Sequence, residues 1–131
     1  FLDRIEIGNF EDDMARIAGC DWIIEVVSER LDIKLKVFEQ VKKHRKPGTI
    51  VSTNTSGIPL KSMVSAMDDE MQRHFLGTHF FNPPRYLRLV ELIPTPDTDP
   101  GVTSGLGEFI DKDRRVKIVA VEGNRIVVEA I

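Results

Sequence analysis

The sequence has only one cysteine, Cys20, among its 131 residues. A single cysteine cannot form an internal disulfide, so we expect a reducing compartment and a cytoplasmic location. The chain also has no run of about 18 apolar residues, the length that a membrane-spanning helix needs. These absences argue against a disulfide scaffold and against a membrane protein.

An excess of positive charge is also absent. The chain has 18 basic and 21 acidic residues, which gives a formal net charge of −3. Affinity for nucleic acid comes largely from basic residues that neutralise phosphates, so this balance argues against a nucleic-acid-binding protein. The one basic run, Lys42–Gly48, is short and typical of a solvated helix end, where cations suit the helix dipole.

Several sequence signatures of known sites are missing. No G-x-G-x-x-G motif follows a predicted strand, and the chain has no P-loop, no H-E-x-x-H and no cysteine pair for zinc. Residues 1–13 are acidic where a signal peptide would be basic, and the first residue is not methionine. We therefore expect no metal site and no signal peptide, and we expect the chain to begin inside a longer protein.

What the chain does have is enough apolar sequence for a folded core. Hydrophobic residues make up 41% of it, which suits one domain or a piece of a larger one. Short apolar runs rich in β-branched residues predict strands, and the first of them is typical of a strand buried on both faces. The four predicted strands cover residues 21–27, 49–54, 74–81 and 87–93.

Helical patterns alternate with these strands. The predicted helices cover residues 9–19, 31–46, 59–67 and, less regularly because of three glycines, 99–112. This order predicts an α/β fold with a mostly parallel sheet flanked by helices. Two alternating runs around Glu122-Gly123-Asn124 predict a C-terminal β-hairpin. We divide the chain into a domain over residues 1–112 and a strand or hairpin segment over residues 113–131.

Polar residues follow three of the predicted strands. Glu29 follows the first strand, Asn54 and Ser56 follow the second, and His79 and Asn82 lie at the end of the third. Ligands of open parallel sheets bind beyond the carboxyl ends of the strands. We therefore expect these side chains to share one edge of the sheet and to form a binding site there.

His79 suits proton abstraction from an alcohol. Histidine has a reference pKa of about 6.5, so it can accept and return a proton near neutrality. A carboxylate that fixes its tautomer improves this chemistry, and Glu91 lies in an apolar run where an unpaired carboxylate would be costly. The amide of Asn82 and the hydroxyl of Ser56 are able to bind an oxygen whose charge changes. Spacing alone also allows a purely structural histidine.

Two stretches of the sequence resemble a known family. "VSTNTSGIPL" (51–60) followed by "HFLGTHFFNPPRYLRLVELIP" (74–94) is similar to the NAD-dependent 3-hydroxyacyl-CoA dehydrogenases of fatty-acid β-oxidation. The likeness is greatest to the long bacterial form that is joined to an enoyl-CoA hydratase-like part, and it covers about residues 9–100. It implies part of a Rossmann-like domain, NAD as cofactor and a 3-hydroxyacyl-CoA as substrate.

The resemblance implies a role for each residue that matches the family's catalytic motifs. His79 would be the base that takes the proton from the 3-hydroxyl group, and Glu91 would hold His79. Ser56 and Asn82 would contact the substrate near the reacting oxygen.

The resemblance also points to residues on the cofactor side of the site. Glu29 and Lys34 match positions that line the ribose and nicotinamide of the cofactor, and Asn54 lies close by. The alternative for Glu29 and Lys34 is an acid at a helix start and a solvated lysine. The choice between NAD and NADP stays open from this chain alone, because the acid that reads the ribose lies outside it.

The family's first β-α-β unit, with its glycine-rich turn, and its helical C-terminal domain have no counterpart in the printed residues. We therefore expect the chain to turn over poorly by itself. We also expect it to self-associate as a homo-oligomer, either by strand pairing at uncovered sheet edges or through the terminal hairpin. The main alternative is a catalytically silent oligomerisation or CoA-ester-binding module. A 2-hydroxy-acid or sugar-acid dehydrogenase of similar layout fits the HFFNP block less well.

Overall fold

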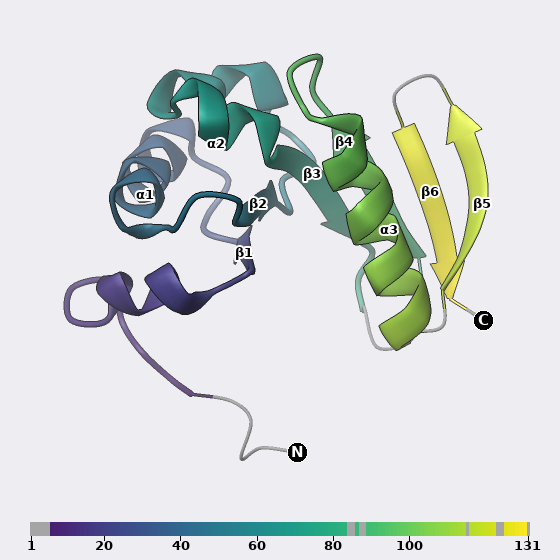
Figure 1. Cartoon of the computed structure of the whole chain (residues 1–131), viewed down its shortest axis with the longest axis horizontal. Coiled ribbons are helices and arrows are strands. Elements are labelled where there is room, and N and C mark those ends of the chain that lie inside the picture. The colour runs from purple at the N-terminus through teal and green to yellow at the C-terminus, as the bar shows by residue number, and fades with distance from the viewer. Residues whose placement is uncertain (1–5, 84–85, 87–88, 115, 123–124, 131) are drawn as a thin grey trace.

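The computed structural model describes residues 6–83, 86, 89–114, 116–122 and 125–130, with side chains only as far as residue 112. Over these residues the strands form one sheet in the order β1-β2-β3-β4-β6-β5 (Figure 1). The strands are β1 (Trp22–Glu25), β2 (Ile50–Thr53), β3 (Phe75–Phe80), β4 (Leu89–Pro94), β5 (Val116–Glu122) and β6 (Arg125–Ala130).

The sheet is mixed. β1, β2 and β3 are parallel, and β4 turns back antiparallel to β3. The predicted hairpin is confirmed in its backbone, since β5 and β6 pair antiparallel and β6 also pairs with β4. Two of the three pairings among β1 to β4 are parallel, so the mostly parallel α/β sheet is confirmed as well. The division between residues 112 and 113 stays a prediction.

The two longest helices confirm the helical spacing of the sequence. They are α1 (Leu31–His44) and α3 (Pro100–Arg114). A short helix that the sequence reading missed, α2 (Asp69–Arg73), is capped by Asp68, whose carboxylate accepts the Met71 N–H at 2.8 Å. No helix in the described part of the chain is long and apolar enough to cross a membrane.

The short helices predicted at 9–19 and 59–67 are present only in part, as shorter 3₁₀ helices. These are η2 (Met14–Gly19), η3 (Leu60–Ser62) and η4 (Val64–Ala66). Ahead of η2, the side chain of Asn9 accepts the N–H groups of Glu11 and Asp12 at 2.9 and 2.8 Å. These are the contacts of an N-cap, but residues 10–12 form only a turn before η2 begins.

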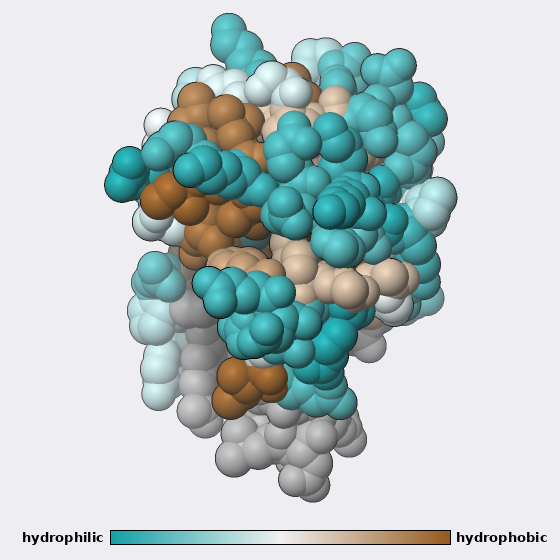
Figure 2. Space-filling view, turned by 90° about the vertical axis from the view of Figure 1, so that its left-hand side faces the viewer, coloured by the Kyte–Doolittle hydropathy of each residue, from teal (hydrophilic) through white to brown (hydrophobic). Residues whose placement is uncertain are grey.

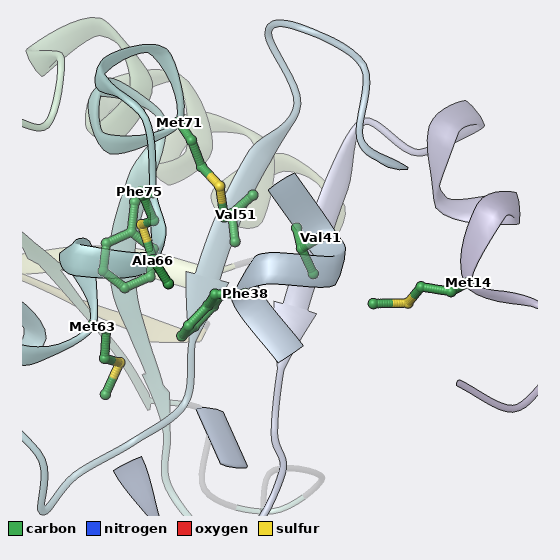
Figure 3. Packing of buried hydrophobic residues seen from close by; sticks show 9 residues of the cluster. Met14, Phe38, Val41, Val51, Met63, Ala66, Met71 and Phe75 are labelled. Atoms are coloured by element: carbon green, nitrogen blue, oxygen red, sulfur yellow. The ribbon is translucent and has the colours of Figure 1, made fainter. Parts of the chain in front are cut away.

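Helices cover both faces of the sheet. On one face Phe38 of α1 meets Phe75 of β3 edge to face, with ring centroids 5.5 Å apart (Figure 3). On the other face Leu106 and Ile110 of α3 pack on a second cluster that includes Leu76. The neighbours Phe75 and Leu76 thus point to opposite faces, as the two-residue period of a strand requires.

β1 was expected to be buried on both faces, and this was wrong. Ile24 is 39% exposed, and Val26, just beyond the end of β1, is 69% exposed. The reason is position, since β1 lies at one end of the strand order and pairs only with β2 among the described strands. Figure 2 shows apolar patches on an otherwise mostly hydrophilic side of the molecule.

Phe38 is fully buried, so its truncation tests the core between α1 and the sheet. We expect Phe38→Ala to lower the free energy of unfolding by about 3–5 kcal/mol, because it removes buried apolar area and leaves a cavity. Urea unfolding followed by circular dichroism measures the change. Phe10→Ala is the control, because Phe10 is 64% exposed, and it should change stability little. Equal effects of the two substitutions would contradict this packing.

Candidate functional site

The predicted polar residues gather where the parallel strands end. A hollow of about 220 Å³ lies at this edge of the sheet. Its walls come from the segments that follow β1 and β2, from the end of β3 and from the first turn of α1. The structure brings six of the seven predicted site residues to it: Glu29, Lys34, Asn54, Ser56, His79 and Asn82.

His79 of β3 and Glu91 of β4 lie opposite each other on neighbouring strands. They are register partners in the antiparallel pair of β3 and β4, which explains why twelve positions separate them in the sequence. The His79 Nδ1 atom lies 3.3 Å from the Glu91 Oε1 atom, and the two side chains are 23% and 14% exposed. Glu91 itself is not among the residues that line the hollow. Because Nδ1 pairs with the carboxylate, Nε2 is the ring nitrogen that remains to exchange a proton with a ligand.

Asn54 ties the end of β3 to the end of β1. Its side-chain oxygen accepts the Phe80 N–H at 2.9 Å, directly after His79, and its own N–H donates to the Glu25 carbonyl at 3.0 Å. These two bonds fix the backbone beside the imidazole. A direct contact between Asn54 and a cofactor stays a prediction.

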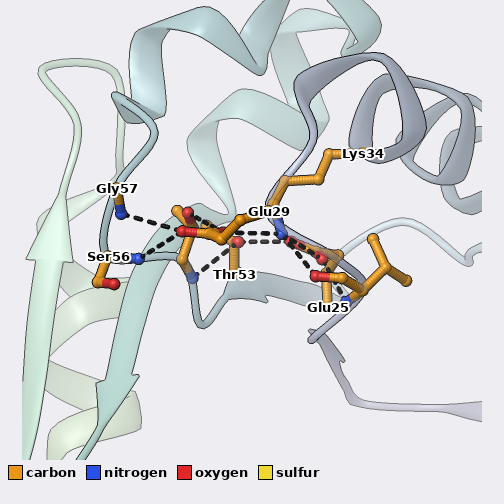
Figure 4. A network of polar contacts seen from close by, with 8 residues as sticks. Glu25, Glu29, Lys34, Thr53, Ser56 and Gly57 are labelled. Carbon is orange, nitrogen blue, oxygen red and sulfur yellow. Dashed lines mark hydrogen bonds and ion pairs between the residues drawn. The ribbon is translucent and has the colours of Figure 1, made fainter.

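A buried ion pair that the sequence reading missed lies beneath the hollow (Figure 4). The Lys34 Nζ atom is 2.8 Å from the Glu25 Oε1 atom, and each side chain is only 1% exposed. Glu25 also accepts the Val27 N–H at 2.7 Å and the Thr53 hydroxyl at 2.5 Å. The signal was present, because Glu25 lies in an apolar run where an unpaired carboxylate is costly. The alternative of a solvated Lys34 is wrong.

Glu29 lies at the rim with its carboxylate directed at the loop after β2. It accepts the Thr55 hydroxyl and the Gly57 N–H, the latter at 3.0 Å, and the Lys34 Nζ atom is 3.4 Å away. The Thr55 hydrogen bond, together with the Gly57 N–H and the Lys34 charge, lowers the pKa of Glu29 below its ordinary value despite partial burial. The carboxylate is therefore ionised near neutral pH.

The side chains at the hollow are of types that can carry out proton transfer. His79, paired with Glu91, has an imidazole that is able to accept a proton, and Ser56 and Asn82 supply neutral hydrogen-bonding groups nearby. Among the residues that the structure describes, no group of three or more His, Cys, Asp or Glu side chains is placed to hold a metal ion.

Comparison with known families decides what kind of domain carries this site. Residues 2–123 match the family described as the NAD-binding domain of 3-hydroxyacyl-CoA dehydrogenase. The chain belongs to this family. NAD is accordingly the cofactor of the domain, and the expectation drawn from the NTSG and HFFNP stretches is confirmed at this level.

Curated relatives agree with the family match. The chain is 52% identical, over 102 residues and 78% of its length, to a probable 3-hydroxyacyl-CoA dehydrogenase of Bacillus subtilis. It is 44% identical, over 92 residues and 70% of its length, to a putative fatty acid oxidation complex trifunctional enzyme of Rickettsia felis. The chain spans only 13% of the length of each of these two relatives.

Solved structures show the same fold. The crystal structure of FadB2 from Mycobacterium tuberculosis matches with a TM-score of 0.71 and 31% identity. The match covers 76% of this chain and 35% of the FadB2 chain. The Rossmann-like arrangement expected from the sequence is therefore confirmed.

The buried Glu25–Lys34 pair generates a stability prediction. We expect Glu25→Gln and Lys34→Met each to lower the free energy of unfolding by about 3–5 kcal/mol, because each leaves a buried charge without its partner. The double variant should lose much less than the sum of the two single losses. Urea unfolding of all four proteins measures the coupling.

The exposed pair of Glu39 and Lys42, whose charged atoms lie 3.1 Å apart, is the matched control. Its two side chains are 52% and 35% exposed, so the same substitutions there should show a coupling of only about 0.3–0.5 kcal/mol. Strictly additive losses at positions 25 and 34 would contradict the buried pair.

Proposed function

We propose that this chain contributes the catalytic half of a site that oxidises (S)-3-hydroxyacyl-CoA to 3-ketoacyl-CoA in fatty-acid β-oxidation. The observation that carries the proposal is the pairing of His79 with Glu91 at the end of β3. The names of two relatives support it: the putative fatty acid oxidation complex trifunctional enzyme of Rickettsia felis and the probable 3-hydroxyacyl-CoA dehydrogenase of Bacillus subtilis. A cytoplasmic location, suggested by the single cysteine, is part of the same proposal.

The proposed step begins with a proton. His79 accepts the proton of the 3-hydroxyl group at Nε2, and the Glu91 carboxylate stabilises the imidazolium that forms. The hydroxyl of Ser56 and the amide of Asn82, both at the hollow, bind the oxygen as it becomes a carbonyl. NAD, when bound, supplies the acceptor for the hydride that leaves C3. The proton returns to solvent from His79 after the product leaves.

The hollow fits the reacting end of the cofactor and not a whole dinucleotide. Its volume of about 220 Å³ is below the roughly 300–1,000 Å³ of sites for drug-sized ligands. Glu29, Lys34 and Asn54 stand on the side where we propose that the nicotinamide ribose lies. The 131 residues contain no glycine-rich phosphate cradle, so we propose that the chain alone binds NAD weakly and turns over poorly.

His79→Gln tests the proposal in a chimera in which this chain replaces the matching segment of the Bacillus subtilis relative. With 3-hydroxybutyryl-CoA and NAD⁺, we expect kcat to fall by about 10²- to 10⁴-fold, because glutamine cannot exchange the proton. NADH absorbance measures the rate, and thermal unfolding checks that the chimera stays folded. The chain alone, in the same assay, should give rates far below those of the chimera.

His44→Gln is the matched control. His44 ends α1 ahead of β2, away from the carboxyl edge, and it does not line the hollow. Its replacement should leave kcat unchanged. An active chimera that keeps its kcat with His79→Gln would refute the catalytic role and favour the silent CoA-ester-binding module, which needs no proton exchange.

We also propose that the chain forms a homo-oligomer through the β1 edge, where Ile24 and Val26 are exposed. Light scattering should give a molecular mass above that of one chain at high concentration, and Val26→Lys should lower it by placing a charge at the edge. Ser104→Lys adds the same charge on the exposed side of α3 and should have no effect. A monomer at every concentration would contradict the proposal.

A further inference from the structure

The loop after β2 converges on a single carboxylate. Glu29 receives the Thr55 hydroxyl and the Gly57 N–H, and the Ser56 N–H lies 3.4 Å from its Oε2 atom. The Lys34 Nζ atom, 3.4 Å from Oε1, is a fourth donor. Four donors of the chain itself therefore converge on the Glu29 carboxylate, although its side chain is 47% exposed. Three of those donors come from the consecutive residues 55, 56 and 57.

Gly57 makes the close approach possible. A Cβ atom at this position would lie 3.3 Å from the Glu29 Oε2 atom, which is tighter than ordinary van der Waals contact. Any larger residue would press on the carboxylate that its own N–H binds. Glycine at position 57 therefore lets its backbone N–H bind Glu29 without displacing the carboxylate, whereas a Cβ atom would require the carboxylate to move by a few tenths of an ångström.

Glu29 is itself held by the buried side chain of Lys34. The Lys34 Nζ atom has three protons, and three acceptors surround it: the Glu25 carboxylate at 2.8 Å, the Val27 carbonyl at 3.1 Å and Glu29. Glu25 is fixed in turn by the Thr53 hydroxyl of β2. A continuous chain of contacts thus runs from the buried strands through Lys34 to the rim (Figure 4).

We infer that Glu29 is a positioning residue that fixes the loop 54–57 and thereby places Ser56 at the hollow. This inference deepens the proposed function, because it rests on Ser56 contacting the substrate there. Glu29 acts through the loop, and Lys34 and Glu25 act through Glu29. The residue that precedes Arg30, the N-cap of α1, thus serves the neighbouring loop and not the helix.

Nuclear magnetic resonance of the ¹⁵N-labelled chain tests the inference without any turnover. The amide proton shift of Gly57 should titrate with Glu29, with a midpoint below the ordinary pKa of 4.5, because Thr55, Gly57 and Lys34 favour the ionised carboxylate. The other ionisable groups around Glu29 are Lys34, Glu25 behind it and His79 across the hollow. Glu29→Gln should abolish this titration and make the Ser56 and Gly57 amides exchange at least about tenfold faster with solvent.

A second variant, at Gly57, keeps the Glu29 carboxylate and disturbs its contact with the loop from the loop side. Gly57→Ala should move the Glu29 midpoint, read from its side-chain carboxyl carbon, upward toward the ordinary value and speed exchange at Ser56. Gly19→Ala is its control, because nothing lies within 4 Å of a Cβ atom at position 19. Glu39→Gln, on the exposed side of α1, is the control for the loss of a carboxylate.

Unchanged amide exchange in both Glu29→Gln and Gly57→Ala would overturn the inference, as would a Gly57 shift that does not titrate. If Glu29→Gln unfolds the chain, the Gly57→Ala result alone decides. Failure of the proposed function appears separately, as an unaffected kcat in the His79→Gln chimera. It would leave the loop measurements as they are.

Discussion

The buried pair of Glu25 and Lys34 is the interaction on which the rest of the site depends. Two charges at 1% exposure are tolerated only when each is matched and hydrogen-bonded, because removing them from water costs several kcal/mol per ion. Here the match comes from three elements at once: β1 carries Glu25, α1 carries Lys34 and β2 supplies the Thr53 hydroxyl. The pair therefore sets where α1 begins relative to the parallel strands.

A second constraint is the register between β3 and β4. His79 and Glu91 meet only because the two strands pair with these residues opposite each other. Side chains alternate along a strand, so a slip of one residue would send either side chain to the opposite face of the sheet. The antiparallel pairing of β4 with β3 is thus what places the Glu91 carboxylate beside His79. His79 stands on a strand that is paired on both sides, whereas Ser56 stands on the loop after β2.

The sequence predicted most of this arrangement where the physics is local. Periodicity located α1, the strands and the hairpin, and the rule for parallel sheets placed Glu29, Ser56 and His79 at one edge. Prediction from the sequence failed where contacts between distant segments determine the structure. The edge position of β1 exposes Ile24, which no local pattern reveals, and the helical patterns at 9–19 and 59–67 form only short 3₁₀ helices. Glu25 was missed although the reasoning applied to Glu91 covers it equally.

The same comparison explains why catalytic and structural charges are hard to separate from sequence. Glu25, Glu29 and Glu91 all lie in or beside apolar strands, and each has a basic partner in space. What separates them is exposure and the identity of that partner. Glu25 is 1% exposed and pairs with Lys34. Glu29 is 47% exposed and binds the loop after β2 as well as Lys34. Glu91 is 14% exposed and pairs with the histidine that lines the hollow. Of the three carboxylates only Glu91 is paired with an imidazole, the side chain most often used in general acid–base catalysis, and this pairing is what the proposed function rests on.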